Sequence, residues 1–283
     1  MNYDEFLKSE PYIAERREKH GALTDVLKQL TVEHMDNCLE YNEILSAYGI
    51  NTTADVMKFT SYEEIPFLPV RMFKEYELMS VPKDAVVKTM TSSGTSGQQV
   101  SKIYLDKVTS SNQSRVMTHI VSDFIGKKRL PMIILDTSAV LKKRAMFSAR
   151  GAGILGFSMF GRDRIYALDD NMKLDVNALK IFLEKYKGED IFLFGFTFMI
   201  WQHFFQELLK SEWKPDLSRG ILIHGGGWKK LQDQAVSPET FKDALNSVCG
   251  ICQNKIYSYY GMVEQTGTIY GVRMRTLPCT SIF

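Results

Sequence analysis

Short apolar runs alternate with helical segments along most of the chain, and this alternation restricts the fold more than any other feature of the sequence. The apolar runs predict strands over residues 85–90, 102–105, 131–135, 191–194, 220–224 and 255–259. The segments between them predict helices over residues 108–125, 175–187, 197–210 and 237–248. Strands that alternate with helices form an α/β fold with a largely parallel sheet.

The first part of the chain shows helical patterning without intervening strands. Apolar residues recur at helical spacing from about residue 4 to residue 48, and Pro11 and Gly21 divide this stretch into several helices. We therefore predict a helical N-terminal region, residues 1–60, packed on an α/β core that comprises residues 61–283.

The composition is that of an ordinary folded protein and argues against several classes of function. Apolar residues make up 45% and charged residues 24% of the 283 residues, which gives no support to a disordered or fibrous chain. Lys and Arg number 35 against 33 Asp and Glu, so the net charge is only +2. A protein that binds nucleic acid by electrostatic attraction is usually far more basic. We expect no nucleic-acid partner.

The sequence also predicts where the protein works. The longest apolar run, residues 191–205, is shorter than the roughly 20 residues of a membrane-spanning helix, and Gly195 and His203 interrupt it. The N-terminus is charged throughout and has no apolar segment typical of a secretion signal. We predict a cytoplasmic protein without a transmembrane segment, whose four cysteines stay reduced.

A loop rich in small polar residues is the first candidate for chemistry. Residues 91–97 read Thr-Ser-Ser-Gly-Thr-Ser-Gly, so seven consecutive residues are Gly, Ser or Thr. Exposed backbone N–H groups and hydroxyls in such a loop can hold phosphate oxygens. The loop is not a Walker A motif, because Gln98 stands where that motif has lysine. Composition alone leaves a second interpretation open, a surface loop of turn-forming residues.

Two predicted strands end in further candidates. The apolar strand that finishes at His224 is followed by Gly225, Gly226 and Gly227, where backbone can be exposed at the carboxyl edge of a sheet. A tight turn from strand to helix is the alternative there. The last predicted strand runs into Tyr260, Gly261 and then Glu264. A tyrosine can stack on a nucleotide base, and a carboxylate can hold Mg²⁺.

These three segments, taken in order, resemble the motifs of adenylate-forming enzymes. The loop resembles their phosphate loop, the three glycines resemble the strand that borders adenine, and residues 260–264 resemble their Tyr-Gly-x-Thr-Glu motif. Within this superfamily the sequence is similar to phenylacetate-CoA ligases and, more closely, to long-chain acyl-protein synthetases of the LuxE type. The segments IPFLPVRMFK, HGGGWK and YGMVEQTG carry that closer similarity. The resemblance implies the layered N-terminal core of these enzymes.

The resemblance also implies a role for each candidate residue. The phosphate loop would hold the β- and γ-phosphates of ATP, Glu264 would bind Mg²⁺, and Tyr260 beside Gly261 would stack on adenine. The glycines 225–227 would border the base. The loop residues implied in phosphate binding are Ser92, Ser93, Gly94, Thr95, Ser96 and Gly97, of which Thr95 and Ser96, with Glu264, are the implied catalytic residues.

The implied reaction is ATP-dependent activation of a carboxylic acid. A long-chain fatty acid would become an acyl-adenylate, and the acyl group would pass to a protein thiol. Two alternatives stay open: an acyl-CoA ligase that uses coenzyme A as acceptor, and a truncated or degenerate homologue that binds nucleotide without turnover. Val263 replaces the usual threonine before the glutamate, and the chain ends at Phe283, so we expect the small C-terminal lid domain to be absent.

Three other patterns are interpreted as structural. Residues 151–156 match G-x-G-x-x-G, but the preceding segment is basic and not an apolar strand, so we predict helix or loop packing. Cys249 and Cys252 have the spacing of half a zinc site without a second pair, so we predict buried thiols. The aromatic residues of segment 192–205 predict core, with the wall of an acyl pocket as the alternative.

Overall fold

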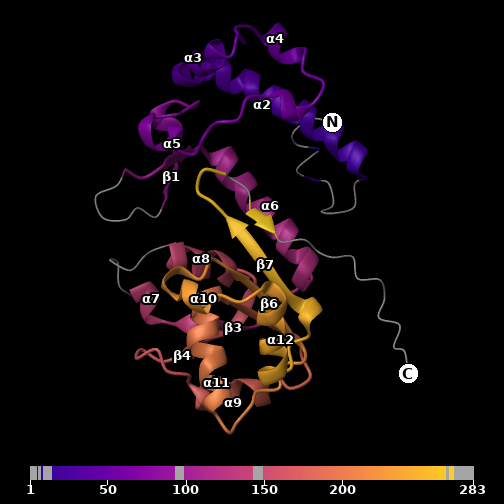
Figure 1. Cartoon of the computed structure of the whole chain (residues 1–283), viewed down its shortest axis with the longest axis vertical. Helices are drawn as coiled ribbons and strands as arrows, with labels where there is room; N and C mark the ends of the chain where they lie inside the picture. Colours follow the sequence, from indigo (N-terminus) through magenta and orange to yellow (C-terminus); the bar gives the residue numbers. More distant parts are fainter. Residues whose placement is uncertain are drawn as a thin grey trace. The chain divides into compact units, whose positions relative to one another are not determined.

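The computed structural model describes residues 5, 8, 15–92, 99–142, 149–265 and 268–270 (Figure 1). The chain divides into two compact units. The first unit comprises Met1–Asp123 and Met262–Gly267, and the second comprises Phe124–Gly261 and Thr268–Phe283. The predicted boundary at residue 60 stays a prediction.

The first unit is mostly helical and contains one hairpin. Its helices are α2 (Arg16–Asn37), α3 (Leu39–Ala47), α4 (Thr53–Met57), α5 (Met72–Glu75) and nearly all of α6 (Lys107–Ile125). A small apolar cluster of Met35, Leu45, Ile50 and Val56 holds α2, α3 and α4 together. Strands β1 (Lys88–Thr91) and β2 (Lys102–Leu105) pair antiparallel, so the Ser/Thr/Gly segment connects the two strands of a hairpin.

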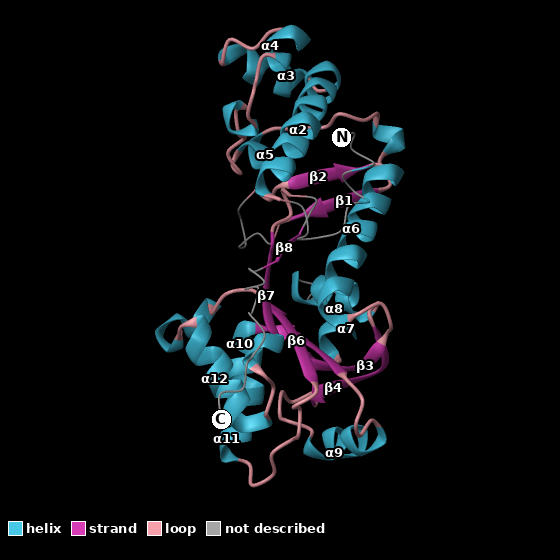
Figure 2. Cartoon of the chain, turned by 90° about the vertical axis from the view of Figure 1, so that its right-hand side faces the viewer, coloured by secondary structure: helices cyan, strands magenta, loops and turns pink. Residues whose placement is uncertain are grey.

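The second unit is built on a six-stranded sheet with the order β4-β3-β5-β6-β7-β8. Figure 2 labels its strands β3, β4, β6, β7 and β8. The strands are β3 (Leu130–Thr137), β4 (Gly161–Leu168), β5 (Ile191–Phe196), β6 (Gly220–Gly225), β7 (Ile256–Gly261) and β8 (Thr268–Tyr270). The first five are parallel, and β8 is antiparallel to β7. The chain leaves β3 for β4 on one side and later returns to β5 on the other. Open α/β sheets bind ligands beyond the carboxyl ends of their strands, at such a reversal of strand order.

Helices cover both faces of this sheet. They are α7 (Ala139–Lys142), α8 (Ala149–Ser158), α9 (Val176–Lys185), α10 (Thr197–Met199), a π-helical turn (Ile200–Phe205), α11 (Gln206–Lys210) and α12 (Pro238–Cys249). On one face, Phe157 of α8 stacks on Phe194 of β5 with ring centroids 4.2 Å apart. On the other face, Leu193 joins a core cluster with Trp201 and with Phe241 of α12. The alternation along β5 thus fills both layers, which confirms the predicted α/β fold.

Local sequence explains where α12 begins and ends. The Ser237 hydroxyl accepts a hydrogen bond from the Thr240 N–H, and Pro238 occupies the first helical position, where its missing N–H costs nothing. The helix ends at Gly250, whose φ of 75° lies in the left-handed region that glycine adopts most easily. The predicted helix over residues 237–248 is confirmed.

The six predicted strands are all present, but β4 and the short strand β8 were missed. The sequence of β4 explains why it was missed. That sequence, Gly-Arg-Asp-Arg-Ile-Tyr-Ala-Leu, carries three charged residues near its start. A strand at the border of a sheet has a free side that charged residues can occupy, so it lacks the apolar run on which the prediction relied. The predicted G-x-G-x-x-G segment is helical and belongs to α8, as expected. None of the described helices is long and apolar enough to cross a membrane.

Candidate functional site at the carboxyl edge of the sheet

The ends of three neighbouring strands meet at the carboxyl edge, the edge of the sheet at which the parallel strands finish. In the register of the sheet, Gly225 of β6 lies opposite Phe196 of β5 on one side and Tyr259 of β7 on the other. Tyr260 follows Tyr259 and therefore lies at the same edge. The structure thus brings together the three glycines and the Tyr260–Gly261 pair, which lie more than 30 residues apart in sequence.

Gly225 has no side chain because the ring of Tyr259 occupies the space. A Cβ atom at this position would lie 2.3 Å from Cε1 of Tyr259. The Tyr259 ring also lies beside Phe157, at 5.0 Å between centroids, and burial raises its pKa to about 12. Gly225 is therefore required by packing against the partly buried Tyr259 ring.

The next two glycines and Tyr260 are exposed. Gly226 has a φ of 75°, and a Cβ atom at Gly227 would meet nothing within 4 Å. Tyr260 is 59% exposed and lies near the end of β7, where the strand becomes exposed. Exposed backbone and an exposed aromatic ring at one edge of a sheet are groups against which a flat heterocycle can pack. We call residues Gly225–Gly227 the glycine turn.

Two buried polar side chains form hydrogen bonds next to the glycine turn. The Thr197 hydroxyl donates a hydrogen bond to the Gly225 carbonyl at 3.2 Å and lies 3.0 Å from Nδ1 of His224. Burial, aided by the positive charge of Lys242, lowers the pKa of His224 to about 4. The imidazole is therefore neutral at pH 7 and can donate only one N–H.

A buried ion pair lies at the end of β3. Nε of Arg150, in α8, is 3.1 Å from Oδ2 of Asp136, whose side chain is fully buried. Oδ1 of Asp136 accepts a hydrogen bond from the Thr137 N–H. Burial raises the pKa of Asp136, and the Arg150 charge opposes that rise. The sequence gives one sign of this pair, a carboxylate that directly follows a run of apolar strand residues, but the predicted site does not include it.

The candidates of the first unit belong to the hairpin and to a turn. Ser92 extends the hairpin, since its N–H donates to the Ser101 carbonyl at 3.1 Å and its hydroxyl accepts from the Ser101 N–H at 2.9 Å. Glu264 is half-buried in a turn closed by a hydrogen bond from the Gln265 N–H to the Met262 carbonyl. The loop residues Ser93, Gly94, Thr95, Ser96 and Gly97 lie outside the described residues.

The cysteine pair does not form a metal site. Cys249 is buried, and burial raises its pKa to about 12, but Cys252 is exposed, so the prediction of buried thiols is wrong for that residue. Cys252 follows the end of α12 in a surface segment. Among the residues that the structure describes, no group of three or more His, Cys, Asp and Glu side chains could hold a metal ion.

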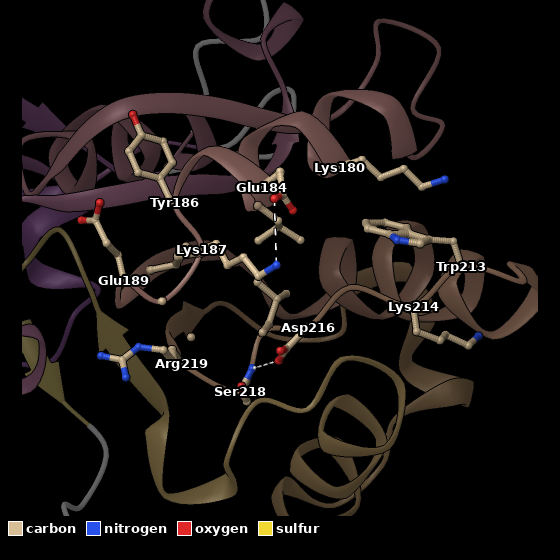
Figure 3. A pocket seen from close by; sticks show the side chains of 15 residues that line it. Lys180, Glu184, Tyr186, Lys187, Glu189, Trp213, Lys214, Asp216, Ser218 and Arg219 are labelled. Carbon is tan, nitrogen blue, oxygen red and sulfur yellow. Dashed lines mark hydrogen bonds and ion pairs between the residues drawn. The ribbon is translucent and has the colours of Figure 1, made fainter.

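A cavity of about 490 Å³ lies at the opposite, amino edge of the sheet, where β5 and β6 begin (Figure 3). Its lining is highly charged. Nζ of Lys180 lies 5.6 Å from the centroid of the Trp213 ring, Lys187 pairs with Glu184, and the Asp216 carboxylate accepts from the Ser218 N–H. The cavity contains none of the predicted site residues.

Solved structures of adenylate-forming enzymes share this fold. The chain is similar to an open conformation of 2-hydroxyisobutyryl-CoA ligase in complex with 2-HIB-AMP and CoA, with a TM-score of 0.60 and 12% identity over 92% of this chain and 55% of that chain. The same ligase in its postadenylation state, in complex with 2-HIB-AMP, gives a TM-score of 0.60, 12% identity, and 92% and 54% coverage. The chain spans about half the length of these ligases. Its fold is that of an adenylate-forming ligase core.

The family follows from the sequence as a whole. The model of the family "Acyl-protein synthetase, LuxE" matches residues 2–274, so the chain belongs to the LuxE acyl-protein synthetase family. The resemblance that the three motifs predicted is confirmed. A comparison with curated protein sequences gave no match.

Proposed function

We propose that the protein activates a carboxylic acid with ATP to form an acyl-adenylate. One observation carries the proposal: the exposed backbone of Gly226 and Gly227 lies at the carboxyl edge together with the exposed Tyr260, in the fold of a ligase that was solved with an acyl-adenylate. This is the edge at which open α/β sheets bind nucleotides.

The residues present at the glycine turn are suited to an adenine base. A Cβ atom at Gly226 would lie 3.1 Å from the Phe196 ring, and the backbone of Gly227 faces open space. A side chain at either position would therefore be strained or would cover the backbone. Tyr260 supplies an aromatic face on which a flat base can stack. In this proposal Gly225, Gly226 and Gly227 border the base, with Tyr260 and Gly261 beside it.

The phosphates of ATP are assigned to the hairpin loop. Ser92, Ser93, Gly94, Thr95, Ser96 and Gly97 would provide backbone N–H groups and hydroxyls to the β- and γ-phosphates. Negative charge grows on pyrophosphate as the substrate carboxylate attacks the α-phosphate, so fixed donors lower the barrier to that step. The position of Ser92 at the last pair of the hairpin supports the assignment, because it ties the start of the loop to a paired strand.

Glu264 is our candidate ligand for Mg²⁺. Proteins commonly hold Mg²⁺ with one or two carboxylates together with substrate phosphates, so a single half-buried carboxylate is sufficient. The ion, when bound, would neutralise phosphate charge. This requirement is consistent with the absence of a cluster of three metal-ligating side chains among the described residues.

The acid and the acceptor are the finer part of the proposal. The family description names an acyl-protein synthetase, which supports an acyl substrate and a protein thiol as acceptor. A long-chain fatty acid is our candidate substrate. The second candidate acceptor is coenzyme A, because the ligase of similar fold was solved in complex with CoA.

The decisive experiment is pyrophosphate exchange into ATP that depends on an added fatty acid. We expect exchange with the native chain, and a loss of about 100-fold in Glu264→Ala, which removes the metal-binding carboxylate. Glu189→Gln is the matched control, since Glu189 forms an exposed ion pair with Arg162 at the amino edge, and its exchange rate should be unchanged. Exchange that survives in Glu264→Ala would contradict the role of Glu264.

Val263 supports a second candidate function, nucleotide binding without turnover. Its side chain has no hydroxyl to offer to phosphate. A folded native chain that binds ATP but shows no exchange with fatty acids of several lengths would favour this function.

If the protein is active, radiolabelled fatty acid separates the two candidate acceptors. Label on a protein thiol supports an acyl-protein synthetase, and label on added coenzyme A supports a CoA ligase.

A further inference from the structure

We propose that Thr197 is a positioning residue for the glycine turn, and that it acts through a hydrogen-bonded chain from His224 to the Gly225 carbonyl. The inference rests on the proposed function, because the group that it positions is the backbone assigned to the nucleotide base. Thr197 is the first residue after β5, and His224 and Gly225 are the last residues of β6, so the chain joins two neighbouring strand ends.

The direction of the chain follows from the number of donors. The Thr197 hydroxyl has one proton, and its hydrogen bond to the Gly225 carbonyl uses that proton. The Thr197 oxygen can therefore only accept from His224, whose Nδ1 lies 3.0 Å away. This requires the neutral tautomer with the proton on Nδ1. The sequence of donors is His224 Nδ1–H to Thr197 Oγ1–H to the Gly225 carbonyl.

Water cannot easily replace this chain. Thr197 is 7% exposed and His224 is 8% exposed. The centroid of the His224 ring lies 4.7 Å from that of Phe241, a residue of α12. A buried polar group that loses its partner incurs the full cost of desolvation. Removal of the Thr197 hydroxyl would thus take away the hydrogen-bond partner that it provides to the imidazole N–H and to the Gly225 carbonyl.

The Gly225 carbonyl controls the direction of the next N–H group. The carbonyl of Gly225 and the N–H of Gly226 belong to one planar trans peptide, so they point in opposite directions. Thr197 follows β5 and holds the carbonyl on the β5 side, and the Gly226 N–H is therefore directed to the β7 side, where Tyr260 lies. The hydrogen bond from Thr197 thereby directs the Gly226 N–H toward the surface proposed for the base.

The test compares Thr197→Val with Thr197→Ser. Valine keeps the size of threonine and removes the hydroxyl, whereas serine retains it. We expect Thr197→Val to raise the KM for ATP by about fivefold with kcat within twofold of the native value, and Thr197→Ser to stay within about twofold in both. Thr31→Val is the matched control, since Thr31 is another buried threonine whose hydroxyl donates to a backbone carbonyl, that of Leu27, in the first unit.

Two measurements without substrate keep the inference separate from the proposed function. Amide hydrogen exchange of the segment around residues 224–228 should be faster in Thr197→Val than in the native chain, and unchanged in Thr197→Ser and in Thr31→Val. The ¹⁵N shifts of His224 should report a proton on Nδ1 in the native chain. If the native protein shows no pyrophosphate exchange, the proposed function fails. These two measurements still show whether the hydrogen bonds from His224 through Thr197 to the Gly225 carbonyl are present.

The inference is overturned by either of two results that need no substrate, and by a third in an active enzyme. One is equal hydrogen exchange at residues 224–228 in the native chain and Thr197→Val. The other is a proton on Nε2 of His224, which reverses the donors. In an active enzyme, an unchanged KM in Thr197→Val also overturns it.

Discussion

The two edges of the second unit's sheet differ in how their polar groups are held. At the amino edge, the cavity is lined by charged side chains at the surface, such as Arg219, whose ion pair with Asp190 measures 2.9 Å and leaves the two side chains 56% and 42% exposed. At the carboxyl edge, Asp136, Thr197 and His224 are buried, and each contacts a neighbouring strand end or helix.

The candidate site therefore does not coincide with the cavity. Exposed ion pairs contribute little because water screens them and long side chains lose entropy when they are held. Buried polar groups require nearly ideal partners, so they fix the backbone around them. The candidate site is therefore the edge with exposed glycines and buried polar support, and substitutions at the two edges should differ sharply in cost.

The largest effect is expected at the buried ion pair. Arg150→Met leaves the Asp136 carboxylate buried without its countercharge, and we expect a loss of about 3–5 kcal/mol in the free energy of unfolding at pH 7. Arg162→Met, which breaks an exposed pair with Glu189, should cost less than about 1 kcal/mol. Urea titration followed by tryptophan fluorescence reports on the second unit, because all three tryptophans lie there.

The stability lost in Arg150→Met should depend on pH in a defined direction. Burial raises the pKa of Asp136 above its value in the unfolded chain, so the folded state binds this proton more tightly. The stability that this proton provides is present at low pH and is lost as the pH rises through the folded pKa. The deficit of Arg150→Met relative to the native chain should therefore be smaller at pH 5 than at pH 7. An equal deficit at both values would contradict a buried, ionised Asp136.

The next effect concerns the glycines. Gly225→Ala places a methyl group against the Tyr259 ring, and we expect a loss of about 1–3 kcal/mol of stability. Gly227→Ala is the matched control, because its Cβ atom would meet nothing within 4 Å, and its stability should change by less than about 0.5 kcal/mol. Equal melting temperatures for the two variants would mean that Tyr259 does not fill the space beside Gly225.

His224 should make stability depend on pH over a different range. Its pKa is about 4 in the folded chain and near 6.5 when unfolded, so the unfolded chain binds the proton first as pH falls. The free energy of unfolding should therefore fall by about 1 kcal/mol per pH unit between pH 6.5 and 4. His224→Gln should show a flatter dependence over this range when the two chains are compared by urea titration. Parallel curves would contradict the burial of a neutral imidazole.

The smallest effect is expected at the amino edge. Arg219→Gln removes one exposed ion pair beside the cavity, so its stability should change by less than about 1 kcal/mol and its rate of pyrophosphate exchange should equal that of the native chain. A clear fall in exchange would mean that the amino edge takes part in the reaction and would reverse the comparison between the edges.

Much of the fold was predictable because the strands of a parallel sheet are apolar on both faces. Residues 191–196 read Ile-Phe-Leu-Phe-Gly-Phe, and such a run has one stable place, the centre of a sheet covered by helices. The charged strand β4 lacks that signal and was missed. Its place beside β3 depends on hydrogen bonds to a segment about 30 residues earlier, which local patterns do not reveal.

The candidate site was predictable where chemistry follows from residue type. Glycines at a strand end and a tyrosine beside another glycine are visible in the sequence. Thr197 was not selected, because one threonine after an apolar run has no distinctive pattern. Its importance comes from the register that sets β5 beside β6 and so brings its hydroxyl to the Gly225 carbonyl.

The sequence by itself determined the α/β class, the order of the three motifs and the family, since these depend on residue types and their spacing. Only the tertiary structure decided which glycine serves packing and which are exposed, because that depends on where the Tyr259 ring lies. It also decided that Asp136 meets Arg150 and that Thr197 meets His224. Such pairs join different strands and helices, and the free energy of a buried polar contact depends on a partner that only the folded chain supplies.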